Sequence, residues 1–376
     1  MIVTVTSQAS MIVAPNQVID TPTMAVDEEI LHRNIAEMAA LAKSHGVNLR
    51  PHIKTHKTPE IARLQIAAGA NGITCAKIGE AEVMVDAGID DVLLAYPTVG
   101  EIKIRRLLVL MERARMIVAL DSHEAAAAVS DAMSVRDRVL EVYVEVDTGQ
   151  HRAGQLAGEE AVRLALELAR MPGLRLIGVM SHEGHANQQP PETIEGVALD
   201  AGRRLVDTAE KIRGHGIDLS VVSVGSTPAA TYTPTVHGVT EMRPGTYVFK
   251  DTTAFRYGVY GPDRCAARIL ATVVSHTSRE HCIIDAGSKT LSLDLSKGHP
   301  GHGYIVTQPG AVIGPLSEEH GVVKLSLDDP DVKIGDRLEI IPNHICPAVN
   351  LMEELVIVRD GQVIDTWKVA ARGKIR

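Results

Sequence analysis

Residues 116–132 read MIVALDSHEAAAAVSDA, a short apolar run followed at once by a stretch rich in helix-forming residues. The run Met116–Leu120 has no polar alternation, which is typical of a parallel strand buried on both faces. Comparable runs occur as VLLA at residues 92–95 and as LIGVM at residues 176–180. The sequence therefore predicts a repeated unit of one buried strand and one helix.

This unit recurs along most of the chain. Strands are predicted at residues 48–53, 72–76, 91–95, 116–120, 141–146, 174–180, 219–224 and 243–249. Helices are predicted at residues 58–68, 79–87, 101–114, 123–132, 158–170 and 191–215, with an additional helix at 27–45. Eight such units predict an α/β fold, the (β/α)8 TIM barrel. A doubly wound open sheet is the alternative, but no GxGxxG follows the first strand.

The pattern changes after about residue 257. Strand-like segments such as ILATVVSHT, HCIIDAG and DRLEIIPNH follow one another without long helices, and Asp360-Gly361 is typical of a tight hairpin turn. We expect a C-terminal antiparallel β domain at residues 257–376, after a barrel at residues 21–256. The segments IVTVT and MIVAP, within residues 1–20, are expected to be strands that join the β domain.

Composition narrows the class of function. The chain has 376 residues, a net charge of −9 and only 3% aromatic residues, so neither nucleic acid nor an anionic membrane surface is an expected partner. Four cysteines in a chain of this length do not indicate a disulfide framework. No apolar stretch approaches the length of a membrane span, and the N-terminus lacks the pattern of a signal peptide. A cytoplasmic location is therefore expected.

A barrel carries its active site at the carboxyl ends of its strands. The first predicted strand ends in RPHIKTHK, residues 50–57, where an amine could form a Schiff base with a carbonyl compound. A solvated basic loop is the alternative interpretation. The fifth strand is followed by Arg152, which could bind an anionic oxygen, and the sixth by His182 and His185.

Two turns follow the seventh and eighth predicted strands, where barrels often bind phosphate. The first contains Gly225, Ser226 and Thr227, whose backbone N–H groups and hydroxyls suit a phosphate. The second contains the group Gly245, Thr246 and Tyr247. A reactive lysine at one strand end and a phosphate cradle at two others indicate pyridoxal 5′-phosphate as the cofactor.

The segment IPNHICP, residues 341–347, brings a histidine and a cysteine two positions apart. On a strand, His344 and Cys346 would point to the same side and could bind one metal ion, with zinc as the first choice. The spacing alone favours the simpler alternative of a core histidine and a buried cysteine.

Taken together, these segments resemble the fold-type III pyridoxal phosphate enzymes, and more narrowly the D-threonine aldolase / D-serine dehydratase group, which shares its architecture with alanine racemase. The resemblance covers nearly the whole chain and is most specific in RPHIKTHK, GSTP, RPGTYVF, SEEHG, DAGSK and NHICP. It implies a homodimer that binds pyridoxal phosphate and a divalent metal, zinc or alternatively manganese.

The resemblance also implies roles for individual residues. Lys54 matches the lysine that binds the cofactor, Arg152 an arginine near the cofactor ring, and His344 with Cys346 the metal pair. The turns at Gly225–Thr227 and Gly245–Tyr247 match the phosphate-binding turns. His182 is expected to be catalytic, and His185 and His320 are further candidates for a second base.

The implied substrate is a 3-hydroxy-D-amino acid. A cysteine in the metal pair favours dehydration of D-serine or D-threonine to a 2-oxo acid and ammonia. Retro-aldol cleavage to glycine and an aldehyde, as in D-threonine aldolase, is the alternative, and an amino-acid racemase is less favoured because racemases of this fold need no metal.

Overall fold

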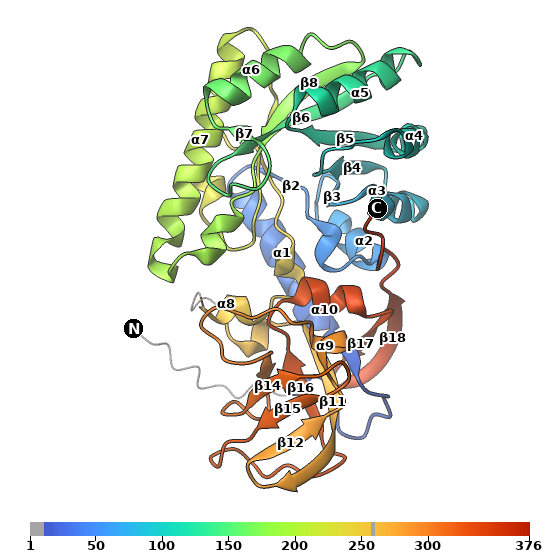
Figure 1. Ribbon diagram of the computed structural model, residues 1–376, viewed down its shortest axis with the longest axis vertical. Helices are drawn as coiled ribbons and strands as arrows, with labels where there is room; N and C mark the ends of the chain where they lie inside the picture. Colours follow the sequence, from blue (N-terminus) through green and yellow to red (C-terminus); the bar gives the residue numbers. More distant parts are fainter. Residues whose placement is uncertain (1–10, 257–259) are drawn as a thin grey trace. The chain divides into compact units, whose positions relative to one another are not determined.

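The computed structural model describes residues 11–256 and 260–376, and the chain forms two compact units (Figure 1). Unit 1 contains the described residues up to 36, together with residues 55–60 and 246–373. Unit 2 contains residues 37–54, 61–245 and 374–376. Each unit therefore draws on several separate segments of the chain.

The core of unit 2 is a sheet of eight parallel strands in the order β2-β10-β9-β8-β6-β5-β4-β3. An isolated parallel bridge between His52 and Thr74 links the two ends of this order, so the sheet closes on itself. The predicted barrel is confirmed. The strands are β2 (Asn48–Leu49), β3 (Ile73–Cys75), β4 (Asp91–Leu94), β5 (Arg115–Leu120), β6 (Leu140–Asp147), β8 (Leu174–Met180), β9 (Val221–Val224) and β10 (Glu241–Met242), with the short β7 (Gln155–Leu156) beside β6.

Helices connect these strands and correspond to those predicted. They are α1 (Glu28–Ser44), α2 (Pro59–Ala67), α3 (Ile78–Asp86), α4 (Glu101–Leu110), α5 (His123–Ser134), α6 (Glu159–Leu168) and α7 (Ile194–Gly214). Helix α6 shows why such segments are helical: Glu159 and Glu160 lie in its first turn, where negative charge is favourable, and Ala161, Leu164 and Leu168 form a buried stripe. No helix in the described ranges is both long and apolar enough to cross a membrane.

The continuous apolar runs are explained by burial on both faces of the barrel sheet. Residues Met116–Leu120 of β5 are all buried. Within the sheet, Leu93, Ile117, Ala119, Tyr143 and Met180 pack into one cluster. Such strands need no polar alternation, because neither face contacts water.

Unit 1 is built on a second sheet, in the order β14-β15-β12-β11-β1-β17-β18, in which β16 pairs with β11 and β13. Its strands are β1 (Thr23–Asp27), β11 (Ala267–Ser278), β12 (His281–Ile284), β13 (Tyr304–Ile305), β14 (Val312–Leu316), β15 (Gly321–Lys324), β16 (Arg337–Ile341), β17 (Glu354–Arg359) and β18 (Gln362–Lys368). The short helices α8 (Thr252–Arg256), α9 (Ser288–Leu291) and α10 (Ile345–Leu351) belong to the same unit. The expected antiparallel pairing holds except between β1 and β17, which are parallel, so the sheet is mixed.

Two strand predictions were wrong. The eighth barrel strand is Glu241–Met242 rather than residues 243–249, because Pro244 and Gly245 end it and a 3-10 turn, Thr246–Val248, follows. The segment MIVAP is not a strand either: the N–H groups of Ile12 and Val13 each donate to the buried Glu339 carboxylate at 2.9 Å instead of to a neighbouring strand. The segment IVTVT lies outside the described residues.

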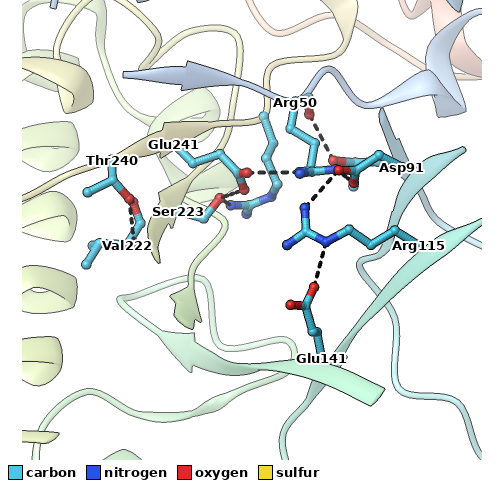
Figure 2. Close-up of polar contacts among 10 residues, drawn as sticks. Arg50, Asp91, Arg115, Glu141, Val222, Ser223, Thr240 and Glu241 are labelled. Atoms are coloured by element: carbon cyan, nitrogen blue, oxygen red, sulfur yellow. Dashed lines mark hydrogen bonds and ion pairs between the residues drawn. The ribbon is translucent and has the colours of Figure 1, made fainter. Parts of the chain in front are cut away.

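Charged side chains connect the barrel strands of unit 2 (Figure 2). The Arg50 guanidinium is buried and donates to Asp91 and, at 2.9 Å, to Glu241. Arg115 joins Asp91 to Glu141 at 2.8 and 2.7 Å. Asp91, Arg115 and Glu241 each begin a strand. Because the amino ends of barrel strands usually serve stability rather than catalysis, we interpret this network as structural.

Candidate active site

Lys54 lies in a single 3-10 turn, Ile53–Thr55, that follows β2. The predicted strand to residue 53 is therefore shorter, although His52 still donates its N–H to Pro244 O at 3.0 Å, beyond the end of β10. Lys54 consequently stands at the carboxyl end of a barrel strand, as expected, and is partly buried.

Lys54 and Arg152 lie close enough to His182 for their positive charges to affect it. Burial and the positive charges of Lys54 and Arg152 lower the pKa of His182 to about 3. His182 is therefore neutral near pH 7. Its Nδ1 atom is 2.5 Å from the carbonyl oxygen of Gly225, so this nitrogen carries the proton and donates it. The structure thus brings together Lys54, Arg152 and His182, three of the predicted residues.

The loop that carries Arg152 is shaped by Asp147. The Asp147 carboxylate accepts hydrogen bonds from the N–H groups of Gly149 and His151. Although burial raises the pKa of Asp147, these backbone donors outweigh it and the pKa is lowered. The second histidine after β8, His185, is partly buried, and its Nδ1 atom has no hydrogen-bond partner in the described part of the chain.

Glu183 is a residue that the sequence interpretation missed. Its side chain is 0% exposed, and its Oε2 atom accepts the Gly225 N–H at 3.1 Å, whereas Oε1 has no partner among the described residues. Burial raises its pKa to about 6. The sequence feature that could have pointed to Glu183 is a carboxylate between two histidines, shortly after a buried strand.

The first predicted phosphate turn follows β9. Ser226 is buried, and its Oγ atom accepts the Ala229 N–H at 3.3 Å. The buried Thr227 Oγ1 atom has no hydrogen-bond partner in the described ranges. Nor does any hydrogen bond of the described residues use the N–H groups of Ser226 and Thr227. The turn therefore offers two amides and one hydroxyl to a ligand.

The second predicted turn is divided between the units. Gly245 is the last residue of its segment of unit 2, whereas Thr246 and Tyr247 begin a segment of unit 1. Thr246 starts the 3-10 turn, and Tyr247 is 1% exposed.

His344 and Cys346 lie in unit 1, at the start of α10, and not on a strand as expected. His344 is the residue before the first turn of the helix, and Pro347 lies within that turn, where proline is tolerated. The two side chains nevertheless interact: burial lowers the pKa of His344, but hydrogen bonds with Cys346 and Asp294 outweigh it and raise the pKa to about 9.

Further contacts fix this pair within unit 1. His344 Nδ1 is 2.6 Å from Asp294 Oδ2, and Cys346 Sγ is 3.3 Å from Thr55 Oγ1. His320, by contrast, is exposed and contacts Ser317. No group of three or more His, Cys, Asp or Glu side chains in the described ranges could hold a metal ion.

A closed parallel barrel with a lysine, histidines and a Gly-Ser-Thr turn at its strand ends, joined to a mixed β unit, has the architecture of alanine racemase-like proteins. Residues 26–253 match the family described as alanine racemase, N-terminal domain, and residues 266–358 match the putative serine dehydratase domain. The chain belongs to this family and carries both domains.

Proteins similar over their whole length include lyases with different reactions. A D-threonine aldolase of Arthrobacter sp. is 34% identical over 364 residues, which cover 94% of this chain and 93% of that protein. A D-threo-3-hydroxyaspartate dehydratase of Delftia sp. (strain HT23) is 34% identical over 370 residues, covering 93% and 97%.

Solved structures agree with these matches. The crystal structure of a D-threonine aldolase from Filomicrobium marinum has a TM-score of 0.90 at 34% identity and covers 96% of this chain and 100% of that one. A cysteine-to-alanine variant of D-threo-3-hydroxyaspartate dehydratase, described as the metal-free form, has a TM-score of 0.87 at 32% identity and covers 93% and 97%.

Proposed function

We propose that the protein is a lyase that uses pyridoxal phosphate and a divalent metal to dehydrate 3-hydroxy-D-amino acids such as D-serine or D-threonine. The observation that carries the proposal is the contact between Thr55 Oγ1 and Cys346 Sγ. Thr55 directly follows Lys54 in the chain, so the proposed metal ligand Cys346 contacts the residue next to the proposed cofactor lysine.

The residues of unit 2 fit pyridoxal phosphate. The turn Gly225–Thr227 offers free N–H groups and an unpartnered hydroxyl, which suit a phosphate. Lys54, at a nearby strand end, supplies the amine. Arg152 adds a positive charge in the same region. Gly245, Thr246 and Tyr247 are proposed as the second phosphate-binding segment.

The residues of unit 1 fit a divalent metal. Imidazole and thiolate are ligands of zinc, and manganese is the alternative. A carboxylate on the second ring nitrogen is typical of metal-ligating histidines, and Asp294 occupies this position on His344. One solved structure of the similar dehydratase is of a cysteine-to-alanine variant in the metal-free form. We propose that Cys346 is a metal ligand in this protein.

Different residues of the chain are assigned different parts of the reaction. Pyridoxal phosphate, when bound, supplies an electron sink for the bonds at Cα. Lys54 would hold this cofactor and, as a free amine, would accept the proton from Cα. His344 and Cys346 would hold a divalent metal, which would supply Lewis-acid chemistry for the departure of the Cβ hydroxyl as hydroxide.

The second candidate function is retro-aldol cleavage to glycine and an aldehyde. It is favoured by the full-length similarity to D-threonine aldolases. It also needs a base for the hydroxyl proton, and His185, whose Nδ1 atom has no partner among the described residues, is a candidate. Cys346 in the metal pair favours dehydration. A racemase would require two bases on opposite faces of Cα and no metal. The His344-Cys346 pair therefore argues against a racemase.

Product analysis tests the proposal. The purified protein is incubated with D-serine, D-threonine and D-threo-3-hydroxyaspartate, and oxo acid, ammonia, glycine and aldehyde are measured. We expect oxo acid with ammonia. Glycine with an aldehyde would favour the aldolase. Chelation should abolish the reaction while leaving the absorbance of the bound cofactor, and full activity after exhaustive chelation would contradict the metal role. A homodimer remains a prediction.

A further inference from the structure

Two consecutive side chains hold both polar backbone groups of one glycine. His182 Nδ1 donates to the Gly225 carbonyl oxygen at 2.5 Å, and Glu183 Oε2 accepts the Gly225 N–H at 3.1 Å. The two side chains lie in the segment after β8, which ends at Met180, whereas Gly225 directly follows β9. All three residues belong to unit 2.

We propose that His182 and Glu183 are positioning residues that clamp Gly225 and thereby fix the adjacent phosphate-binding turn. The inference rests on the proposed function, because the phosphate of the cofactor is the ligand of that turn. It assigns a role to Glu183 and gives His182 a role other than that of a catalytic base.

The surroundings of Gly225 leave it little freedom. A Cβ atom at this position would lie 3.0 Å from Arg243 Cβ and 3.2 Å from Arg243 O. Arg243 is itself buried and donates to Ser181 O at 2.6 Å and to Ser223 Oγ. Arg243 therefore ties Ser181, which follows β8, to Ser223 of β9, next to Gly225.

The clamp determines what the turn offers to a ligand. Because His182 and Glu183 occupy both polar groups of Gly225, the next two N–H groups, of Ser226 and Thr227, are the first that are open. A phosphate needs such amides in a fixed direction, since a mobile turn would have to be ordered on binding. The clamp supplies that order before the ligand arrives.

The two roles of His182 make different predictions about isosteric variants. Asparagine places an N–H donor close to the position of Nδ1, whereas glutamine places its amide close to that of Nε2. A clamp through Nδ1 should therefore survive in His182→Asn and fail in His182→Gln. A base acting through Nε2 would be lost in both. Likewise, Glu183→Gln keeps an acceptor for the Gly225 N–H, and Glu183→Ala does not.

The test titrates the apoenzyme and these four variants with pyridoxal phosphate and with pyridoxal, which lacks the phosphate, using the absorbance of the lysine-bound ligand. We expect His182→Gln and Glu183→Ala to lose about fivefold or more in affinity for pyridoxal phosphate and to bind pyridoxal as the wild type does. His182→Asn and Glu183→Gln should stay close to the wild type with both ligands.

Equal losses for both ligands, or no loss in His182→Gln, would overturn the clamp. Thermal unfolding of each apoenzyme identifies any variant that fails to fold. If Glu183→Ala fails to fold, the comparison of His182→Asn with His182→Gln alone tests the proposal. The proposed function fails separately: in that case the wild type itself would not bind pyridoxal phosphate more tightly than pyridoxal.

Discussion

The Nδ1 atom of His344 lies 2.6 Å from Oδ2 of Asp294, although fifty positions separate the two residues in the sequence. The loop that contains Asp294 is held in place by Asn343, whose Nδ2 atom donates to Asp294 O at 3.2 Å and to Gly301 O at 2.7 Å. The carboxylate therefore fixes the orientation of the imidazole, and Nε2 is the nitrogen that we propose as the metal ligand.

Replacing Asp294 should weaken metal binding. We expect Asp294→Ala to lower the affinity for zinc by about tenfold or more, because partners of ligating histidines typically contribute this much. Titration calorimetry of the chelated protein measures the affinity directly. Asp328→Ala is the matched control, since Asp328 is an exposed aspartate of the same unit. Unchanged affinity in Asp294→Ala would show that the contact does not orient a ligand.

Lys54→Ala should eliminate the absorbance of the lysine-bound cofactor together with the lyase activity, because no other amine is assigned to this role. Lys77→Ala is the control: Lys77 follows the neighbouring strand β3 and stacks on the ring of Tyr96 at 3.6 Å. The absorbance spectrum of each variant after reconstitution is the measurement. Retention of the band in Lys54→Ala would move the assignment to another lysine, with Lys57 next in line.

Glu183 should make the stability of the apoenzyme depend on pH. Its pKa is raised from 4.5 to about 6, so the folded protein holds this proton more tightly than the unfolded chain does. The free energy of unfolding that Glu183 contributes is therefore lost as pH rises from 4.5 to 6 and stays lower above that range.

The variant Glu183→Gln cannot ionise and isolates this effect. We expect its unfolding free energy, relative to that of the wild type, to be higher at pH 7 than at pH 4.5 by about 2 kcal/mol. Urea unfolding of both apoproteins at the two pH values measures the difference, in which the titration of all other groups cancels. A difference independent of pH would mean that folding does not shift the pKa of Glu183.

Gly225 should not tolerate a side chain. The added methyl of Gly225→Ala would press on Arg243, and we expect a loss of about 1–3 kcal/mol in stability together with weaker binding of pyridoxal phosphate. Gly196→Ala in α7 is the control, because its Cβ would meet nothing within 4 Å and alanine favours a helix. Urea unfolding should separate the two variants, and equal stabilities would refute the close contact.

The barrel could be predicted because burial on both faces leaves a continuous apolar pattern, as in Met116–Leu120. The proposed metal pair could be inferred only from two residue types at a fixed spacing. The prediction of a strand at these two residues was wrong. Pro347 is compatible with a first helical turn, and His344 and Cys346 interact at the start of α10. The two side chains still interact, with His344 in an extended backbone conformation just before the helix rather than within it.

Buried charge is what the sequence could not reveal. Glu183 and Arg50 have residue types that are usually solvated, and their burial depends on partners far away in the chain: Gly225 for the first, Asp91 and Glu241 for the second. Arg50 was even expected to belong to a basic segment at an active-site strand end. Only the closed barrel brings these partners together.

The division of the chain into six interleaved segments has a consequence for dissecting the protein. The backbone passes from one unit to the other five times, and its last three residues return to the barrel, where Gly79 N donates to Arg376 O at 3.0 Å. No single cut therefore yields one unit whole and free of the other. Truncation or fusion at one junction would disrupt both units. The two units therefore have to be expressed and engineered together as one chain.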